Sequence, residues 1–356
     1  MALVLVYRTG GFGDHIIGLP CLHLVARQFP GDRRILIANS PSNSKVPSAT
    51  EIFAGSGLFE DILLVPRHPM KHPMEMARLH RRITRLGAST LVYLPCLPAE
   101  IPVDIPKRIF RDIAFFYLAG VRNFIGLPAR GNLNRLKLPS GSWEPERDRL
   151  ARMLSGIGKV DYSSKNNWDL RLTDEEKDWG SSQVRSLGDR PVLAISISSS
   201  IQAKDWTLER WVALMPGLRK AFPSHALIAV GAALDYQPSQ SVLSSWEGPH
   251  LNLCGLASPR QTAAALGKCD IFFGVDSGPM HLAASLGVPC VIVFSARAPK
   301  GIWFPYGERH EILYTETSCS NCGLDVCITE NRRCLLSIMP GDVIAAALRI
   351  KASMNH

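Results

Sequence analysis

The chain alternates short apolar runs with helical patterns along most of its length, and this alternation constrains the fold more than any other feature. The runs are five or six residues long, rich in Val, Ile and Leu, and bounded by polar or turn residues. Strands that are apolar throughout are buried on both faces, as in parallel sheets covered by helices. The sequence therefore predicts an α/β fold with strands at 2–7, 34–38, 61–65, 90–94, 192–197, 226–230, 271–275 and 290–294.

Two groups of strands, separated by a polar stretch, indicate two domains. The stretch 131–191 is rich in Gly, Pro, Arg and Glu, and one helix is expected there at about 144–156. Other helices are expected at 15–28, 73–86, 208–221 and 279–286. We predict two Rossmann-like domains that face each other across a cleft at the carboxyl ends of their sheets, where such sheets bind ligands. The expected boundaries are 1–172 for the first domain, 173–190 for a linker, 191–339 for the second domain and 340–356 for a C-terminal helix.

The composition is that of a folded globular protein. The 356 residues are enough for two domains with separate cores, and 46% are hydrophobic and 20% charged. No apolar run approaches the roughly 20 residues that cross a bilayer. The N-terminus enters a strand directly, without the basic region and cleavage site of a signal peptide. We therefore expect a cytoplasmic protein.

The net charge of +9 arises entirely in the first half of the chain. Residues 1–170 contain 23 Lys and Arg against 14 Asp and Glu, whereas residues 171–356 contain 17 of each kind. Much of the excess lies in 67–87 and 106–111. This distribution indicates either a solvated helix face or a surface for an anionic partner, such as a phosphorylated glycolipid or the acidic inner leaflet of a membrane. Nucleic acid is not expected, because no recognition motif accompanies the charges.

The first candidate motif is the loop RTGGFGDHIIGLP, which follows the first strand. Gly11 and Gly13 allow the backbone to turn tightly and to approach a ligand, and the helix that follows presents free amides. Asp14, near the start of that helix, suits either a helix cap or a catalytic carboxylate. The loop does not match G-x-G-x-x-G, which argues against a nicotinamide-dependent oxidoreductase.

The second candidate motif is SSSIQAKDWTLERW, which follows the strand expected at 192–197. Lys204 comes after a loop of small residues and suits either an ordinary surface position or the binding of a phosphate as a point charge. Thr207 is expected to cap the next helix, with Trp206 and Trp211 packed beneath it.

The third motif, GVDSGPMHLAASLGVP, is the most specific of the three. Asp276 forms the turn after a strand, and a helix of small residues follows. The amides of Ser277, Gly278 and Met280 at the N-terminus of that helix make a site for a diphosphate. His281, in the first turn, either packs within the helix layer or reaches the same anion.

Together the three motifs resemble glycosyltransferase family 9, the ADP-heptose:lipopolysaccharide heptosyltransferases. The resemblance rests on Gly-Asp with Leu-Pro six residues on, on Lys-x-Trp-x₄-Trp, and on GVDSGPMHLAASLGVP followed by FSARAPKGIWFPYG. The segment FYLAGVRNFIGLP is also similar to a segment of the family, so the resemblance spans nearly the whole chain. It implies a GT-B fold, with an acceptor domain, a sugar-nucleotide domain and a C-terminal helix that crosses back.

The resemblance also implies roles for individual residues. Asp14 takes the place of the family's catalytic carboxylate, Lys204 that of a lysine that binds donor phosphate, and Asp235, more loosely, that of an acid that binds the ribose. Gly11 and Gly13 are expected on the donor side of the first loop, where Gly11 replaces a serine that the family often has. The donor-diphosphate block falls on Asp276, Ser277, Gly278, Met280 and His281.

The function implied is the inverting transfer of a heptose from a nucleotide-activated donor, expected to be ADP-heptose, to a lipopolysaccharide-type glycan. Asp14 would take the proton of the acceptor hydroxyl as its oxygen attacks the anomeric carbon. Lys204 and the helix amides would stabilise the leaving diphosphate, and no catalytic metal is expected. A heptosyltransferase acting on a protein hydroxyl, and a non-catalytic protein that binds sugar nucleotides, are the alternatives.

Four of the nine cysteines cluster in the segment 317–336 with the spacing C-x₂-C-x₄-C-x₆-C. Four thiols this close in sequence can close tetrahedrally on one structural zinc or iron ion, and chance clustering or a disulfide pair are the alternatives. Family members that glycosylate autotransporter proteins are similar in having a cysteine-bound metal. The expected ligands are Cys319, Cys322, Cys327 and Cys334, whereas Cys21, Cys96, Cys254, Cys269 and Cys290 are expected to be small core residues.

Overall fold

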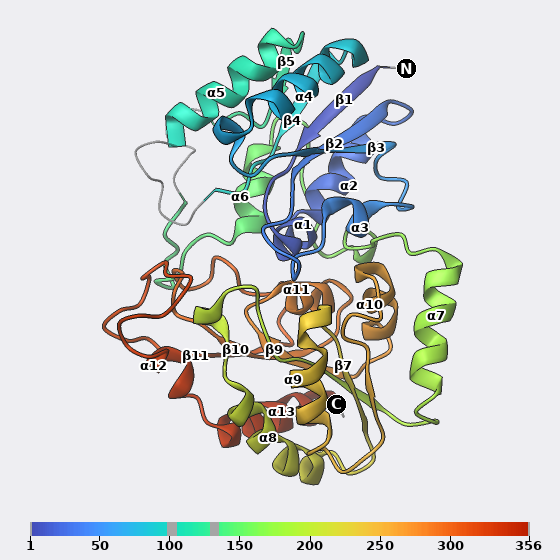
Figure 1. The fold of residues 1–356 in the computed structure, drawn as a ribbon, viewed down its shortest axis with the longest axis vertical. Coiled ribbons are helices and arrows are strands. Elements are labelled where there is room, and N and C mark those ends of the chain that lie inside the picture. The colour runs from blue at the N-terminus through green and yellow to red at the C-terminus, as the bar shows by residue number, and fades with distance from the viewer. Residues whose placement is uncertain (1, 98–104, 129–134, 355–356) are drawn as a thin grey trace. The chain divides into compact units, whose positions relative to one another are not determined.

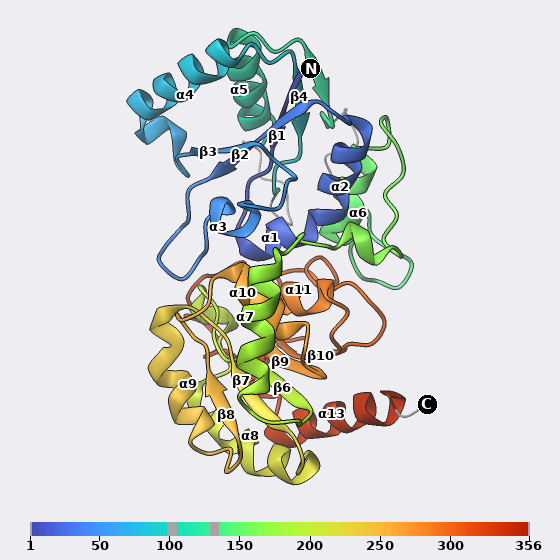
Figure 2. The same ribbon diagram turned by 90° about the vertical axis from the view of Figure 1, so that its right-hand side faces the viewer.

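The computed structural model of the chain describes residues 2–97, 105–128 and 135–354. The chain divides into two compact units, one made of Met1–Ser42 and Pro47–Arg171 and the other of Asn43–Val46 and Leu172–His356. Each unit contains one parallel sheet with helices on its faces (Figures 1 and 2). The α/β class predicted from the alternation of strands and helices is confirmed.

The first unit has a five-stranded parallel sheet in the order β3-β2-β1-β4-β5. Its strands are β1 (Leu3–Tyr7), β2 (Arg33–Asn39), β3 (Asp61–Val65), β4 (Thr90–Tyr93) and β5 (Asn123–Ile125). Its helices are α1 (Phe12–Ile17), α2 (Leu19–Gln28), α3 (Ala49–Phe53), η1 (Pro69–Lys71), α4 (Pro73–Leu86), α5 (Ile105–Leu118), α6 (Glu146–Met153) and η2 (Lys165–Asn167). Helices α4 and α5 bury Leu79, Ile83, Ile109 and Phe116 against one face of the sheet.

The second unit has a six-stranded parallel sheet in the order β11-β10-β9-β6-β7-β8. Its strands are β6 (Val192–Ser196), β7 (Ala226–Ala229), β8 (His250–Asn252), β9 (Ile271–Val275), β10 (Cys290–Phe294) and β11 (Glu311–Tyr314). Its helices are α7 (Asp174–Arg185), η3 (Gln202–Lys204), α8 (Leu208–Ala221), η4 (Ala233–Asp235), α9 (Tyr236–Leu243), α10 (Pro259–Leu266), α11 (Gly278–Ser285), α12 (Arg333–Leu336) and α13 (Pro340–Met354). Counted from its own first strand, the first sheet has the order 3-2-1-4-5 and the second the order 3-2-1-4-5-6, which is typical of Rossmann folds.

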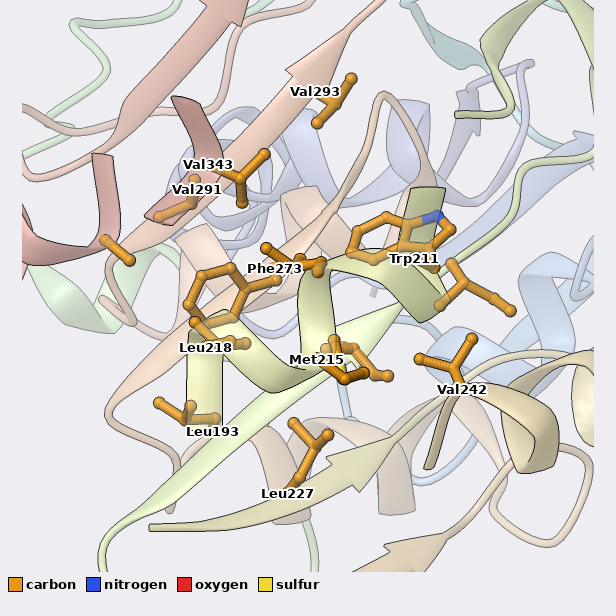
Figure 3. Close-up of a cluster of buried hydrophobic side chains, with 14 of the residues drawn as sticks. Leu193, Trp211, Met215, Leu218, Leu227, Val242, Phe273, Val291, Val293 and Val343 are labelled. Atoms are coloured by element: carbon orange, nitrogen blue, oxygen red, sulfur yellow. The ribbon is translucent and has the colours of Figure 1, made fainter. Parts of the chain in front are cut away.

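Helix α8 shows how the sequence pattern builds the core of the second unit. Thr207 caps the helix by accepting a hydrogen bond from the backbone N–H of Arg210, as predicted. The buried residues Trp211, Leu214, Met215 and Leu218 recur every three or four positions, which puts them on one face of the helix. Figure 3 shows this face packed over side chains of the sheet and of α13, among them Leu193, Leu227, Phe273, Val291 and Val343.

Two expectations about helices differ from the structure. The helix expected at 15–28 is divided at Gly18 into α1 and α2. The expected linker contains α7, because Thr173 and Glu176 form a capping box at its start and the helix packs against α10. The C-terminal helix α13 is present and packs against α8, β10 and β11 of the second unit (Figures 1 and 2). Its buried residues Val343 and Ile350 complete the core there.

Strands β5, β8 and β11 are absent from the sequence-based expectations. Each is three or four residues long and lies at the edge of its sheet. These three edge strands are short and lack the longer apolar run by which the other strands, including the edge strand β3, are recognised. Within the described residues, no helix is both long enough and apolar enough to cross a membrane.

Candidate active site

The strand order of each sheet reverses direction at one point, and the candidate site residues follow the strands at that point. The reversal lies between β1 and β4 in the first sheet and between β6 and β9 in the second. Open parallel sheets bind ligands outside the carboxyl ends of the strands at this position. Asp14 follows β1, Lys204 follows β6 and Asp276 follows β9. Each of these side chains therefore lies at the edge where its own sheet can hold a ligand.

Asp14 is held in the first turn of α1 by two hydrogen bonds to its carboxylate. Its Oδ2 atom accepts one of 2.6 Å from the backbone N–H of Gly11, and its Oδ1 atom accepts one of 3.3 Å from the thiol of Cys96. Gly10 has a φ of +132°, and a Cβ atom there would lie 2.4 Å from the Cβ of Asp14, so glycine is required beside this side chain. Both hydrogen bonds hold the carboxylate in one orientation. The structure thus places Asp14, which is half-buried, as a fixed acceptor at the sheet edge.

Cys96 corrects an expectation, because it contacts the candidate catalytic carboxylate instead of acting as a core residue. It follows β4, the neighbour of β1, and its backbone N–H donates to Oγ1 of Thr9, which ties the two strand ends together. Burial, and after it the charge of Asp14, raises the pKa of the Cys96 thiol well above its usual value, so that the thiol stays protonated and donates. The other four expected core cysteines are buried: Cys21, Cys254, Cys269 and Cys290.

Behind Asp14 lies a buried cluster of charges that the sequence analysis did not find. Arg8, at the end of β1, donates to the backbone oxygen of Asp14 over 2.6 Å and pairs with Glu146 of α6. Glu146 also pairs with Arg135 over 2.7 Å and with Arg149 over 2.8 Å, and all four side chains are at most 1% exposed. Burial acts to raise the pKa of Glu146, but the arginines, Arg149 foremost, lower it to about 2. Part of the positive charge of the first half is therefore internal, not at the surface.

Lys204 and Asp276 form an ion pair in the second unit. The Nζ atom of Lys204 lies 2.8 Å from Oδ2 of Asp276, and the side chains are 15% and 3% exposed. Lys204 ends η3, and Asp276 directly follows β9, which pairs with β6. The sequence indicated both residues but not their pairing, which depends on the strand order. An ammonium group has three donor hydrogens, so the pair fixes Lys204 while leaving it able to bind a further anion.

The third motif forms the turn after β9 and the start of α11. Ser277 is the N-cap and the helix begins at Gly278, so the first N–H groups of the helix have no partner within it. The Oγ atom of Ser277 is buried and has no hydrogen-bond partner among the described residues. The side chains of Met280 and His281 are buried. The backbone N–H of Met280 therefore remains the group that is predicted to contact a ligand.

Asp235 lies at the carboxyl end of β7, in η4, and is connected to the loop that carries Lys204. Its Oδ1 atom accepts a hydrogen bond of 2.6 Å from Ser198, a residue of the loop between β6 and η3, and its Oδ2 atom accepts one of 2.9 Å from the backbone N–H of Ala232. The structure thus brings Lys204, Asp276 and Asp235 to one sheet edge of the second unit. Asp14, Gly11 and Gly13 lie together in the loop and helix after β1, in the first unit.

The four clustered cysteines line one cavity in the second unit. That cavity is bounded by Cys319, Cys322, Cys327 and Cys334 together with Ala203, Ser295, Arg297 and Glu330. Burial acts to raise the pKa of Cys327, but hydrogen bonds from backbone N–H groups, that of Arg332 foremost, lower it. Burial raises the pKa of Cys334, and the nearby thiols of Cys319 and Cys327 raise it further. Across the residues that the structure describes, however, no three His, Cys, Asp or Glu side chains are arranged to hold a metal ion.

Comparisons with known proteins identify a family and a fold for this chain. Residues 143–332 match the family description "Glycosyltransferase family 9 (heptosyltransferase)". Lipooligosaccharide heptosyltransferase 2 of Campylobacter jejuni serotype O:2 is 28% identical over 98 residues, which are 27% of this chain and 30% of that protein. The chain therefore aligns with less than a third of the length of this curated relative.

Solved structures resemble the chain over almost its whole length. A family 9 glycosyltransferase from Veillonella parvula DSM 2008 matches with a TM-score of 0.74 and 17% identity, covering 99% of this chain and 98% of that one. The ADP-heptose lipopolysaccharide heptosyltransferase II of E. coli matches with a TM-score of 0.68 and 16% identity over 100% of both chains. The iron-containing dodecameric glycosyltransferase TibC of enterotoxigenic E. coli H10407 matches with a TM-score of 0.50 and 11% identity, covering 99% of this chain and 77% of that one. At these identities the likeness concerns the fold, and it confirms the GT-B class expected from the motifs.

Proposed function

This chain belongs to glycosyltransferase family 9, and on that premise we propose that it is an inverting glycosyltransferase that moves a heptose from a nucleotide-activated donor to a lipopolysaccharide-type glycan. ADP-heptose is the proposed donor. The observation that carries the proposal is the position of Asp14 and of the Lys204–Asp276 pair at the strand-order reversals of the two Rossmann sheets. The proposed acceptor side is the first unit, and the proposed donor side is the second.

The donor diphosphate is assigned to Lys204 and to the first turn of α11. Lys204 is paired with Asp276. The adjoining backbone N–H groups of Ser277 and Gly278 form the N-terminus of α11, which is the positive end of the helix dipole, at the same sheet edge. Asp235 is the proposed partner of the ribose, because its carboxylate is fixed beside the same loop. These groups stabilise the negative charge that develops on the leaving diphosphate.

The transfer step is assigned to Asp14. As the acceptor oxygen forms its bond to the anomeric carbon, the bond from that carbon to the diphosphate oxygen breaks, and the nucleoside diphosphate leaves with the electron pair. Asp14 takes the proton from the acceptor hydroxyl, which is the role of a general base. The hydrogen bonds from Gly11 and Cys96 fix the carboxylate in position for this step.

Nucleotide release tests the proposal. The protein is incubated with ADP-heptose, other ADP-sugars and UDP-sugars, each with and without a heptose-deficient lipopolysaccharide core and a serine-containing peptide. We expect ADP release that depends on ADP-heptose and on the glycan. Transfer to the peptide alone would replace the glycan acceptor with a protein hydroxyl, and binding without release of nucleotide would identify a non-catalytic protein.

We also propose that the surface of α4 and α5 touches the anionic inner leaflet of a membrane. These helices lie side by side, as their contact between His80 and Phe115 shows (Figures 1 and 2). Their surface combines apolar side chains that are 73–78% exposed with exposed cations. The apolar residues, including those of the preceding turn, are Met70, Met74, Phe110 and Leu118, and the cations are Arg78, Arg81, Arg85, Lys107 and Arg108. Such a combination suits an acidic lipid surface.

Charge reversal tests this contact. The Arg81→Glu/Arg85→Glu variant is expected to bind vesicles containing anionic phospholipid at least about tenfold more weakly, since each basic residue contributes roughly 1 kcal/mol near such a surface. Co-sedimentation with anionic and with neutral vesicles measures the effect. The Lys220→Glu/Lys268→Glu variant of the second unit carries the same charge change and serves as the control. Equal binding by all three proteins would refute the contact.

We further propose a structural zinc or iron ion at the four clustered cysteines. Sulfur donors suit these metals, and Cys327 already has the lowered pKa and the backbone hydrogen bond that favour a thiolate. The similar structure TibC is described as iron-containing, which supports the proposal. When bound, the ion would supply a tetrahedral crosslink within the segment 317–336.

Metal analysis decides this proposal. Protein purified without chelators is expected to hold about one zinc or iron ion per chain. The Cys319→Ser/Cys322→Ser variant should lose it, whereas Ser320→Ala, in the same turn, should retain it. Less than about half an equivalent in the unmodified protein would contradict the site.

A further inference from the structure

The segment 317–336 makes direct contacts with η3, the short turn that carries Lys204. The backbone N–H of Ala203 donates to the backbone oxygen of Asp325 over 3.0 Å. The side chain of Gln202 accepts a hydrogen bond of 3.0 Å from the backbone N–H of Cys327. Two consecutive residues of η3 are therefore bonded to the cysteine-rich segment from more than 120 positions away in the sequence.

The same segment also reaches the residue that follows Lys204. A guanidinium nitrogen of Arg332 donates to the backbone oxygen of Asp205 over 3.3 Å, while the backbone N–H of Arg332 donates to the sulfur of Cys327. Arg332 has a φ of +58°, a backbone conformation that residues other than glycine adopt at a cost in free energy. Contacts with its surroundings must therefore hold it there. Contacts on both sides of Lys204 thus come from one segment.

The cysteine-rich segment is itself fixed to the sheet. Arg297, in the loop after β10, donates to the backbone oxygens of Gly323 and Leu324 and pairs with Asp325 over 2.8 Å. Ser295, at the end of β10, donates to the backbone oxygen of Ala203 over 3.0 Å. The end of β10, the cysteine-rich segment and η3 therefore form one hydrogen-bonded assembly.

This assembly helps to hold the turn that carries Lys204, together with the ion pair of Lys204 and Asp276 and the hydrogen bond from Ser198 to Asp235. Strand β6 ends at Ser196, so the residues from there to Lys204 have no ladder of strand hydrogen bonds. Within η3 the backbone bonds are those from the N–H groups of Lys204 and Asp205, and a 3₁₀ turn of three residues is weak by itself. A shift of the turn would displace the Lys204 ammonium relative to the first turn of α11.

We infer that the cysteine-rich segment positions Lys204 for the donor diphosphate, with Gln202 and Arg332 as positioning residues. This inference rests on the proposed role of Lys204 in donor binding. The inference requires no bound metal. Ligation or oxidation of the cysteines would also change donor affinity, because Cys327 is hydrogen-bonded to Gln202. A displaced ammonium weakens binding of the nucleoside diphosphate and leaves acceptor binding to the other unit unchanged.

Calorimetric titration with ADP tests the inference on the full-length protein. Lys204→Met should weaken ADP binding by about ten- to a hundredfold, since a hydrogen bond to a charged group is lost. Gln202→Met has nearly the same length but cannot accept the bond from Cys327, and it should weaken ADP binding by roughly two- to tenfold. Arg332→Ala should act in the same direction. Gln28→Met, an exposed position in the first unit, is the matched control and should bind ADP normally.

A double variant separates positioning from a general loss of structure. If Gln202 acts through Lys204, adding Gln202→Met to Lys204→Met should change the ADP dissociation constant less than about twofold, because the two effects are coupled. An equal further loss in the double variant would overturn the inference. So would normal ADP binding by both Gln202→Met and Arg332→Ala while Lys204→Met binds weakly. Normal binding by Lys204→Met would instead remove the proposed role of Lys204 itself.

Discussion

The Asp14→Asn variant is expected to lose about 10²- to 10⁴-fold in the rate of heptose transfer while binding ADP as the unmodified protein does. The amide has the shape of the carboxylate and can still accept the hydrogen bond from Gly11, so the loop keeps its structure. It cannot take a proton at neutral pH, and general-base assistance contributes this factor. Single-turnover measurements with saturating ADP-heptose report the transfer step directly.

Asp61→Asn is the matched control for this experiment. Asp61 begins β3 in the same unit, and its carboxylate is paired with Arg82. The Asp61→Asn variant should transfer heptose at the normal rate. Unchanged single-turnover kinetics for Asp14→Asn would exclude Asp14 as the base. Equal losses of transfer and of ADP affinity would instead indicate that the change had disturbed the fold.

The Glu146→Gln variant is expected to be about 3–5 kcal/mol less stable to unfolding. Glu146 pairs with Arg8, Arg135 and Arg149 in the buried cluster, and neutralising it removes the anion that these three guanidinium groups share. Urea denaturation, followed by fluorescence of the tryptophans, measures the change. Glu60→Gln, which breaks an exposed pair with Arg33, should have a much smaller effect. An unaltered midpoint for Glu146→Gln would show that the cluster is not stabilising.

The pH dependence of stability provides an independent check on Glu146. Its pKa is lowered from 4.5 to about 2 in the folded protein, although burial alone would raise it, because the arginines favour the carboxylate. A lowered pKa contributes stability that is complete above 4.5 and is lost as the pH falls toward 2. Unmodified protein should therefore lose stability over this interval, and Glu146→Gln should lose less over the same interval.

The sequence allowed those elements to be predicted whose boundaries carry local signals. Helices were expected at 73–86, 208–221 and 340–356; α4 and α8 have the expected bounds, and α13 is described over Pro340–Met354. Proline or a capping threonine starts each helix, and apolar residues repeat at the helical period. The central strands were predicted because their short apolar runs are also a local signal. In contrast, the residues of α7 were assigned to a linker because they are mostly polar, although Thr173 and Glu176 form a capping box at the start of the helix.

The site was predictable only where one short motif supplies the geometry. Asp14 and Lys204 became candidates because each lies in a motif that follows a strand and resembles the family, but their contacts come from distant positions. Cys96 lies 82 residues from Asp14, and Glu146 lies 138 residues from Arg8. Such contacts depend on which strands are neighbours, and the sequence pattern does not specify the strand order. The burial of three arginines was missed for that reason, since arginine is ordinarily a surface residue.

The buried charge cluster alters how the protein's electrostatic behaviour in solution should be interpreted. Of the positive charges in the first half, those of Arg8, Arg135 and Arg149 are internal and pair with Glu146, so among the described residues this cluster takes a net two charges out of the solvent-exposed excess. Electrophoretic mobility, counterion uptake and the ionic-strength dependence of adsorption to vesicles all respond to the charges that mobile ions can approach. A titration of adsorption against salt should therefore show a shallower slope than the residue count implies.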